Sequence, residues 1–117
     1  MDRYHINNAD DFGMCRVANL AVMELLKNDK SALTSSTIMA PCAWAPEAGR
    51  FAAENPELAI GVHLTLTSEW SKYRWAPGNA EHTASLRDEE GYMWHESDQV
   101  EEHVDLDEGE GEIRAQI

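Results

Sequence analysis

The sequence has few basic residues and no long apolar run. Nine Lys and Arg residues stand against 22 Asp and Glu residues, so the formal net charge is −13. A chain this acidic repels the phosphates of nucleic acids and of anionic lipids. No apolar stretch approaches the ~20 residues that cross a bilayer, and the opening Met-Asp-Arg-Tyr-His has no hydrophobic leader core. We therefore expect neither a nucleic acid nor a membrane as a partner.

Cysteine is also scarce. Cys15 and Cys42 are the two in the chain, and their separation does not match a metal-binding motif. We interpret them as free thiols in a reducing compartment, which indicates the cytoplasm. A glycine-rich phosphate loop is missing as well, and with so few cations this disfavours a phosphoesterase. The 117 residues are 43% hydrophobic, which fits one small domain with a modest core.

The first 67 residues alternate between strand-like and helix-like patterns. Apolar residues at helical spacing, namely Ala18, Ala21, Val22, Leu25 and Leu26, predict one face of the first helix. The expected order is strand Tyr4–Ala9, helix Met14–Asn28, strand Leu33–Ala40, helix Pro46–Glu54 and strand Leu58–Leu66. This β-α-β-α-β order with short connections predicts parallel strands and an α/β fold.

The pattern changes after residue 67. Residues 68–108 form an aromatic and acidic insertion without periodicity, and residues 109–117 resemble the start of a helix, so we treat 1–117 as a single incomplete domain. Five of the aromatic residues lie in the insertion: Trp70, Tyr73, Trp75, Tyr92 and Trp94. Two interpretations stay open. The insertion is either a solvated, partly disordered segment or a loop whose rings stack on a ligand such as a sugar.

Two adjacent carboxylates mark the end of the first strand, in Asn8-Ala9-Asp10-Asp11-Phe12-Gly13. Gly13 allows the chain to turn there, so Asp10 and Asp11 can both point at one cavity. One carboxylate can then bind a metal while its neighbour transfers a proton. The competing interpretation is an N-cap for the following helix.

A histidine on the third strand joins these carboxylates. Alternation along Ala59–Leu66 places Ile60, Val62, Leu64 and Leu66 on one face, and Gly61, His63 and Thr65 on the other. The polar face is where α/β proteins build their sites. A lone histidine is commonly structural, but together with Asp10 and Asp11 it indicates a metal ligand.

These motifs together resemble the N-terminal part of the YdjC/ChbG family of carbohydrate deacetylases. The matching stretches are Asn8–Gly13 with its helix, Leu33–Met39, and Asn55–Leu58 leading into Gly61-Val62-His63-Leu64-Thr65-Leu66. The resemblance implies a deformed (β/α) barrel of the polysaccharide-deacetylase type. It also implies a divalent metal, zinc or magnesium, and hydrolysis of N-acetyl groups on amino-sugar oligosaccharides. By position, Asp11 and His63 would be metal ligands and Asp10 the general base.

The chain departs from that family in length. Family members are about twice as long, and their third metal ligand and their general acid have no matching position here. A barrel of this class needs roughly 250 residues. We therefore expect a fragment that is inactive alone. The alternative is a non-catalytic, sugar-binding remnant of the fold in which a partner chain, as in a homodimer, covers the open sheet edge.

Overall fold

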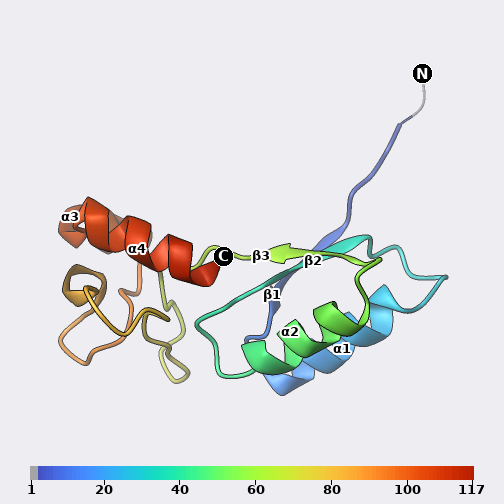
Figure 1. Ribbon diagram of the computed structural model, residues 1–117, viewed down its shortest axis with the longest axis horizontal. Helices are drawn as coiled ribbons and strands as arrows, with labels where there is room; N and C mark the ends of the chain where they lie inside the picture. Colours follow the sequence, from blue (N-terminus) through green and yellow to red (C-terminus); the bar gives the residue numbers. More distant parts are fainter. Residues whose placement is uncertain (1–2) are drawn as a thin grey trace. The chain divides into compact units, whose positions relative to one another are not determined.

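The computed structural model describes residues 3–117, which divide into two compact units that meet between His63 and Leu64. Met1 and Asp2, which the sequence analysis includes in the expected core, lie outside the described residues. The first unit contains β1 (Asn8–Phe12), α1 (Arg16–Leu26), β2 (Ser35–Ile38), α2 (Ala45–Glu54) and β3 (Ala59–Val62). The second unit contains a short 3₁₀ helix, η1 (Ala84–Leu86), followed by α3 (Ser97–His103) and α4 (Leu106–Gln116) (Figure 1).

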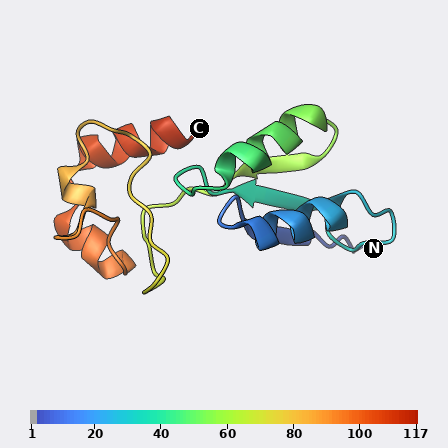
Figure 2. The ribbon, with the colours of Figure 1, turned by 90° about the horizontal axis from the view of Figure 1, so that it is seen from below.

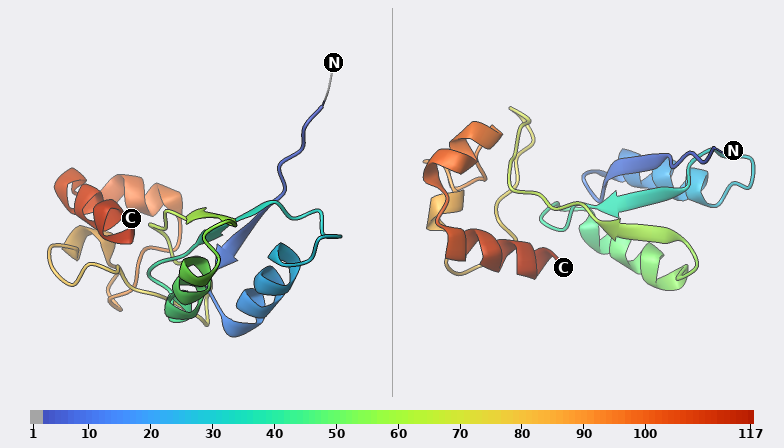
Figure 3. Two further views of the ribbon diagram at one scale, coloured as in Figure 1. Left: turned by 45° about the vertical axis from the view of Figure 1, so that its right-hand side comes forward. Right: turned by 90° about the horizontal axis from the view of Figure 1, so that it is seen from above.

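The first unit confirms the predicted β-α-β-α-β order and its parallel strands. The sheet order is β1-β2-β3, with both pairs parallel. Phe12, Val22, Ala48 and Phe51 form one buried cluster, so α1 and α2 pack on the same face of the sheet. Figure 2 shows the two helices side by side, and Figure 3 shows the strands in front of them in its right panel. The rings of Phe12 and Phe51 meet edge-on, with centroids 6.0 Å apart.

All three predicted strands have different bounds, and the second, predicted over Leu33–Ala40, is limited to Ser35–Ile38. The first begins at Asn8 rather than Tyr4, because Tyr4 and Ile6 are 88% and 84% exposed and bury nothing against the sheet. It then continues through both aspartates to Phe12. The third strand ends at Val62 rather than Leu66. Its neighbour β2 ends at Ile38, whose carbonyl accepts the N–H of His63, and no further β2 residue pairs beyond that point. The prediction that Leu64 continues the apolar face is therefore wrong.

The predicted apolar face of α1 is only partly right. Val22 is buried and Leu26 packs against the core cluster, as expected. Leu25, however, is 44% exposed, whereas Asn19 is completely buried. A polar side chain that the predicted apolar stripe does not include is therefore buried on this helix.

The second unit is folded around an apolar centre rather than solvated along its length. Trp75, Leu86, Met93 and Val100 are buried. Arg87 and Met93 face each other as an antiparallel bridge across a tight turn that ends at Gly91, whose φ is +87°. The interpretation of residues 68–108 as a solvated, partly disordered segment does not fit these four buried side chains.

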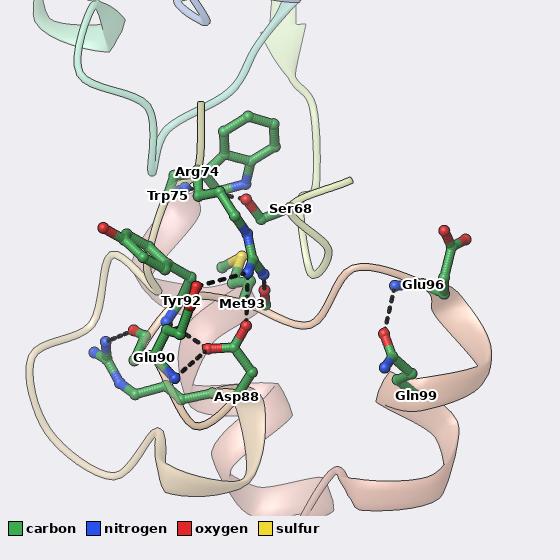
Figure 4. A network of polar contacts seen from close by, with 11 residues as sticks. Ser68, Arg74, Trp75, Asp88, Glu90, Tyr92, Met93, Glu96 and Gln99 are labelled. Carbon is green, nitrogen blue, oxygen red and sulfur yellow. Dashed lines mark hydrogen bonds and ion pairs between the residues drawn. The ribbon is translucent and has the colours of Figure 1, made fainter. Parts of the chain in front are cut away.

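A partly buried ion pair supports that turn (Figure 4). Arg74 Nη1 lies 2.7 Å from Asp88 Oδ2, and Arg74 also donates to the carbonyl of Met93. Burial tends to raise the pKa of Asp88. Hydrogen bonds from Arg74 and from the N–H groups of Tyr92 and Glu90, together with the charge of Arg74, outweigh burial and hold the pKa below its ordinary value of 3.8.

Helix α4 begins at Leu106, three residues before the predicted helix start at residue 109. Asp105 caps it, because its carboxylate accepts the N–H groups of Asp107 and Glu108 at 3.0 and 3.2 Å. Gly109 and Gly111 lie inside the helix, and such residues lower helix propensity, which explains why the sequence pattern placed the start too late.

Two buried polar residues of α4 attach other segments to the helix. Glu112 accepts the N–H groups of Gly78 and Asn79, both at 2.9 Å. Gln116 accepts the N–H of Thr65 at 2.9 Å and donates to its carbonyl at 2.7 Å. Among residues 3–117, no helix is both long and apolar enough to cross a membrane.

Candidate functional site

A bulge in β1 sets the geometry of the two aspartates. Ala9 pairs with Ser36 and Phe12 with Ile38, so Asp10 and Asp11 together face the single residue Thr37. Such a bulge redirects side chains that alternation would place otherwise. Both Ala9 and Phe12 pack in the core, although regular alternation would put residues three apart on opposite faces. The extra residue thus keeps Asp11 out of the core while Phe12 enters it.

Asp10 and His63 lie close together at the carboxyl end of the sheet. Asp10 Oδ1 is 3.9 Å from His63 Nδ1. Thr37 Oγ1 on the central strand is 3.2 Å from the same Asp10 oxygen and 3.4 Å from His63 Nδ1. Asn8 Nδ2 donates to Asp10 Oδ1 at 2.6 Å. Side chains from all three strands therefore converge on one carboxylate oxygen.

The site lies on the sheet face that the helices leave uncovered. Ala9, Ile38 and Ile60 pack against the helices, and Thr37 and Gly61 are the neighbours that alternate to the other side. The predicted division of the third strand, with Ile60 inward and His63 on the polar face, agrees with this packing. The side chain of Asp10 is 65% exposed and that of His63 is 30% exposed. Both groups are open to a ligand.

Asp11 has an unusual backbone conformation. Its φ is +63°, in the left-handed region that residues other than glycine seldom adopt. Its carbonyl accepts the N–H of Met14 at 3.1 Å. Within residues 3–117 its half-buried carboxylate makes no hydrogen bond or ion pair. The structure thus brings Asp10 to His63, whereas no hydrogen bond or ion pair joins the Asp11 side chain to either residue within residues 3–117.

The turn that follows Asp11 depends on Asn19, a buried residue of α1 that sequence reasoning missed. Gly13 has a φ of +94°, its N–H donates to Asn19 Oδ1 at 2.7 Å, and its carbonyl accepts the N–H of Trp44 at 3.1 Å. Asn19 Nδ2 in turn donates to the carbonyl of Trp44 and to Glu47. The sequence contained a signal for this role. Asn19 lies three residues before Val22, on the same side of the helix, and an amide buried there needs hydrogen-bond partners.

The aromatic residues of the second unit divide into two groups. Trp75 is 5% exposed, and the indole N–H groups of Trp75 and Trp94 donate to the carbonyls of Thr67 and Ser85 at 2.8 Å. His103 stacks on Trp94 with ring centroids 4.2 Å apart. These rings hold the unit together. The exposed rings that could contact a sugar are those of Trp70, Tyr73 and Tyr92.

The donor set of the first unit fits part of a metal site. Imidazole nitrogen and carboxylate oxygen together are ligand types that suit zinc, whereas magnesium prefers oxygen alone. Catalytic zinc sites have three protein ligands. No group of three or more His, Cys, Asp or Glu side chains in residues 3–117 has a metal-binding arrangement. Asp11 and His63 have donor atoms of the types that zinc binds, and their role as metal ligands stays a prediction. Cys15 and Cys42 are both free thiols and stand apart from this set.

Comparison with known proteins identifies the family. The model of the YdjC-like proteins matches residues 6–117. The chain belongs to the YdjC-like family. A carbohydrate deacetylase of Enterococcus faecalis is 41% identical over 115 residues, which cover 96% of this chain and 41% of that protein. A chitooligosaccharide deacetylase of Yersinia enterocolitica is 36% identical over 67 residues, which cover 57% of this chain and 26% of that protein.

A solved YdjC-like relative supports the same assignment. It is an Enterococcus faecalis V583 protein named “putative cellobiose-phosphate cleavage protein”, which matches with a TM-score of 0.74 and 40% identity. The match covers 96% of this chain and 41% of the other. This YdjC-like chain therefore spans about two fifths of the length of relatives that it matches throughout. The suspected resemblance to the family is confirmed.

Proposed function

We propose that this chain forms part of the active site of a carbohydrate deacetylase that removes N-acetyl groups from amino-sugar oligosaccharides. The observation that carries the proposal is the approach of Asp10 to His63, with Asp11 next to Asp10 in the bulge of β1. The names of the relatives support carbohydrate deacetylation at the level of the family. Free thiols fit a reducing compartment such as the cytoplasm.

In the proposed mechanism, Asp10 is the general base. Its Oδ1 accepts hydrogen bonds from Asn8 and Thr37, which fix the carboxylate and leave Oδ2 to take a proton from the attacking water. Asp11 and His63 would hold a divalent metal, zinc or magnesium. When bound, such a metal polarises the acetyl carbonyl and lowers the pKa of bound water. Thr37 sets the spacing between the base and the ligand His63.

The proposed reaction needs two functional groups that are not among the side chains described above. A third metal ligand and an acid that protonates the departing amine are needed, and we propose that residues other than these 117 provide them. The matched relatives are more than twice as long as the aligned segment. In that proposal, the parallel sheet is the N-terminal part of a (β/α) barrel, and the chain is inactive by itself.

The decisive test is a chimaeric protein in which residues 6–117 of this chain replace the matching segment of the Enterococcus faecalis deacetylase. We expect it to release acetate from N-acetylated chito-oligosaccharides when zinc or magnesium is present. Asp10→Asn should lower the rate by about 100-fold or more, since general bases contribute 10²–10⁴-fold. The control Asp29→Asn changes an exposed loop carboxylate and should leave the rate within about twofold.

The substrate panel should also contain cellobiose phosphate, because a solved relative is named for its cleavage. A folded, metal-loaded chimaera that releases no acetate from any N-acetylated sugar would refute the substrate assignment. Calorimetry of the 117-residue chain with zinc tests the ligands separately, with Asp11→Ala as the control. If the chain binds no metal but forms a stable dimer by light scattering, the non-catalytic, oligomer-forming alternative is favoured.

A further inference from the structure

We infer that Asn19 is a positioning residue that holds the Asp10–Asp11 bulge in the geometry required by the active site. The inference rests on the proposed roles of Asp11 and His63 as metal ligands. Asn19 lies on α1 and contacts neither Asp11 nor His63. It acts through the backbone of the turn between β1 and α1.

The contacts of Asn19 use both ends of its amide. The side chain is completely buried. Its Oδ1 accepts the N–H of Gly13 at 2.7 Å, and its Nδ2 donates to the carbonyl of Trp44 at 3.1 Å and to Glu47 Oε2 at 2.8 Å. One side chain thereby joins the turn after β1, the loop before α2 and the first turn of α2. No apolar residue of this size could make these three bonds.

These contacts matter because the bulge is held in an uncommon conformation. Asp11 and Gly13 have φ values of +63° and +94°, and a residue such as Asp stays in the left-handed region only where its surroundings fix it. The Gly13 N–H is two residues from Asp11 and is anchored by Asn19. The Gly13 carbonyl is anchored from the other side by the N–H of Trp44 at 3.1 Å. Loss of Asn19 removes the first of these two hydrogen bonds and leaves the Gly13 N–H without its acceptor.

The chain provides a matched control for a merely structural role. Asn55 is also buried, and its Nδ2 donates to the carbonyl of Phe51 at 2.7 Å at the far end of α2. Its contacts involve neither the bulge nor the turn. Asn55→Ala removes a buried amide of the same size, so it should lower stability in the same manner as Asn19→Ala without altering the orientation of Asp11.

The experiment is a zinc titration of the 117-residue chain followed by NMR, at a temperature where each variant is folded. The signals of His63 and the Asp11 amide report metal binding, and hydrogen exchange at Gly13 reports the anchor. Asn19→Ala should weaken zinc binding by about tenfold or more, the lower end of the range for residues that orient metal ligands. Asn19→Ala should also speed amide hydrogen exchange at Gly13 by about tenfold or more. Asn55→Ala should leave both within about threefold.

A second pair of variants keeps the test valid if Asn19→Ala does not fold. Asn19→Asp retains the acceptor for the Gly13 N–H but places a carboxylate against Glu47. Adding Glu47→Gln restores a donor at that contact. We expect Asn19→Asp to weaken zinc binding, and the double variant to recover at least half of the loss on a logarithmic scale.

The outcomes separate the two proposals. If Asn19→Ala is folded and matches Asn55→Ala in both zinc affinity and Gly13 exchange, Asn19 has no positioning role and the inference is overturned. If the unsubstituted chain binds no zinc, Asp11 and His63 do not hold the metal without the third ligand, and the same titration of the chimaera with Asp11→Ala as its control then tests these two ligands. Gly13 exchange then decides the inference alone: faster exchange only in Asn19→Ala supports an anchor for the bulge, and equal exchange in the two variants overturns it.

Discussion

Gly13→Ala is the sharpest test of the turn that follows the two aspartates. Gly13 has a φ of +94°, which an alanine rarely adopts. A Cβ added there would also lie 3.0 Å from the Cα of Ala45, at the start of α2. That neighbour is backbone, so it cannot move away as the end of a flexible side chain could. The substitution therefore combines backbone strain with a steric clash.

The magnitude can be separated into those two parts. Strain of a non-glycine residue in a sparsely populated region costs about 1–3 kcal/mol, and overpacking adds about 1–3 kcal/mol. We expect Gly13→Ala to lower the free energy of unfolding by about 2–6 kcal/mol. Gly91 has a φ of +87°, but a Cβ there meets no atom within 4 Å. Gly91→Ala should therefore show the strain alone, about 1–3 kcal/mol.

Gly49→Ala completes the comparison with a gain in stability. Gly49 lies in the exposed interior of α2, and a Cβ there meets nothing within 4 Å. Alanine should stabilise the helix by about 0.5–1 kcal/mol.

Because the chain forms two compact units, amide hydrogen exchange should be measured in each. The change in amide protection of β2 measures the effect of Gly13→Ala and of Gly49→Ala on the stability of the first unit. The change in amide protection of α4 measures the effect of Gly91→Ala on the second unit. If Gly13→Ala costs less than about 1 kcal/mol, or no more than Gly91→Ala, the reasoning about strain and contact is refuted.

Three further predictions concern buried or bridging polar groups. Burial raises the pKa of Asp88, but the hydrogen bonds from Arg74, Tyr92 and Glu90 and the charge of Arg74 together outweigh burial and lower the pKa in the fold. The ion pair therefore stabilises the fold at pH values above 3.8, the ordinary pKa, and this stability is lost as the pH falls through the lower pKa of the folded state. Hydrogen-exchange protection of α4 should decrease over that acidic range, and it should decrease less in Asp88→Asn. Glu112→Leu leaves the N–H groups of Gly78 and Asn79 without their acceptor and should cost about 2–6 kcal/mol in urea unfolding, more than Glu112→Gln. Thr37→Val removes the hydroxyl between Asp10 and His63 and should weaken zinc binding about tenfold, whereas Thr37→Ser should retain it.

The parallel sheet was predictable because its residues bury apolar side chains in a regular pattern. Ile38 and Ile60 pack against the helices as alternation requires. The ends of strands are set by pairing partners rather than by local pattern. Leu64 continues the alternation of β3 in the sequence but has no paired residue on β2, and it is 51% exposed. A pattern within one strand carries no information on where its neighbour stops.

The candidate site was predicted as a set of residues but not as a geometry. Adjacent aspartates and a histidine two strands away predicted side chains that meet at the carboxyl end of the sheet, and Asp10 and His63 lie 3.9 Å apart there. The bulge, the left-handed backbone of Asp11 and the contacts of Thr37 all depend on pairing between strands. In the second unit the missed features were buried polar groups, such as Glu112 within α4. Its sequence surroundings are acidic and indicate a solvated helix, yet the carboxylate accepts backbone N–H groups from a loop more than thirty residues away.

The bulge links the core to the proposed chemistry through the order Asp-Asp-Phe-Gly. With regular alternation from Ala9, Asp11 would point into the core and Phe12 away from it. Burial of a phenylalanine contributes about 1.5–3 kcal/mol, and an unpaired carboxylate in an apolar core is costly. Both effects favour one extra residue opposite Thr37, since it returns Phe12 to the cluster and releases Asp11. The phenylalanine therefore anchors the strand and the glycine turns it, and the two carboxylates between Ala9 and Phe12 are held at the edge where the proposed reaction needs them.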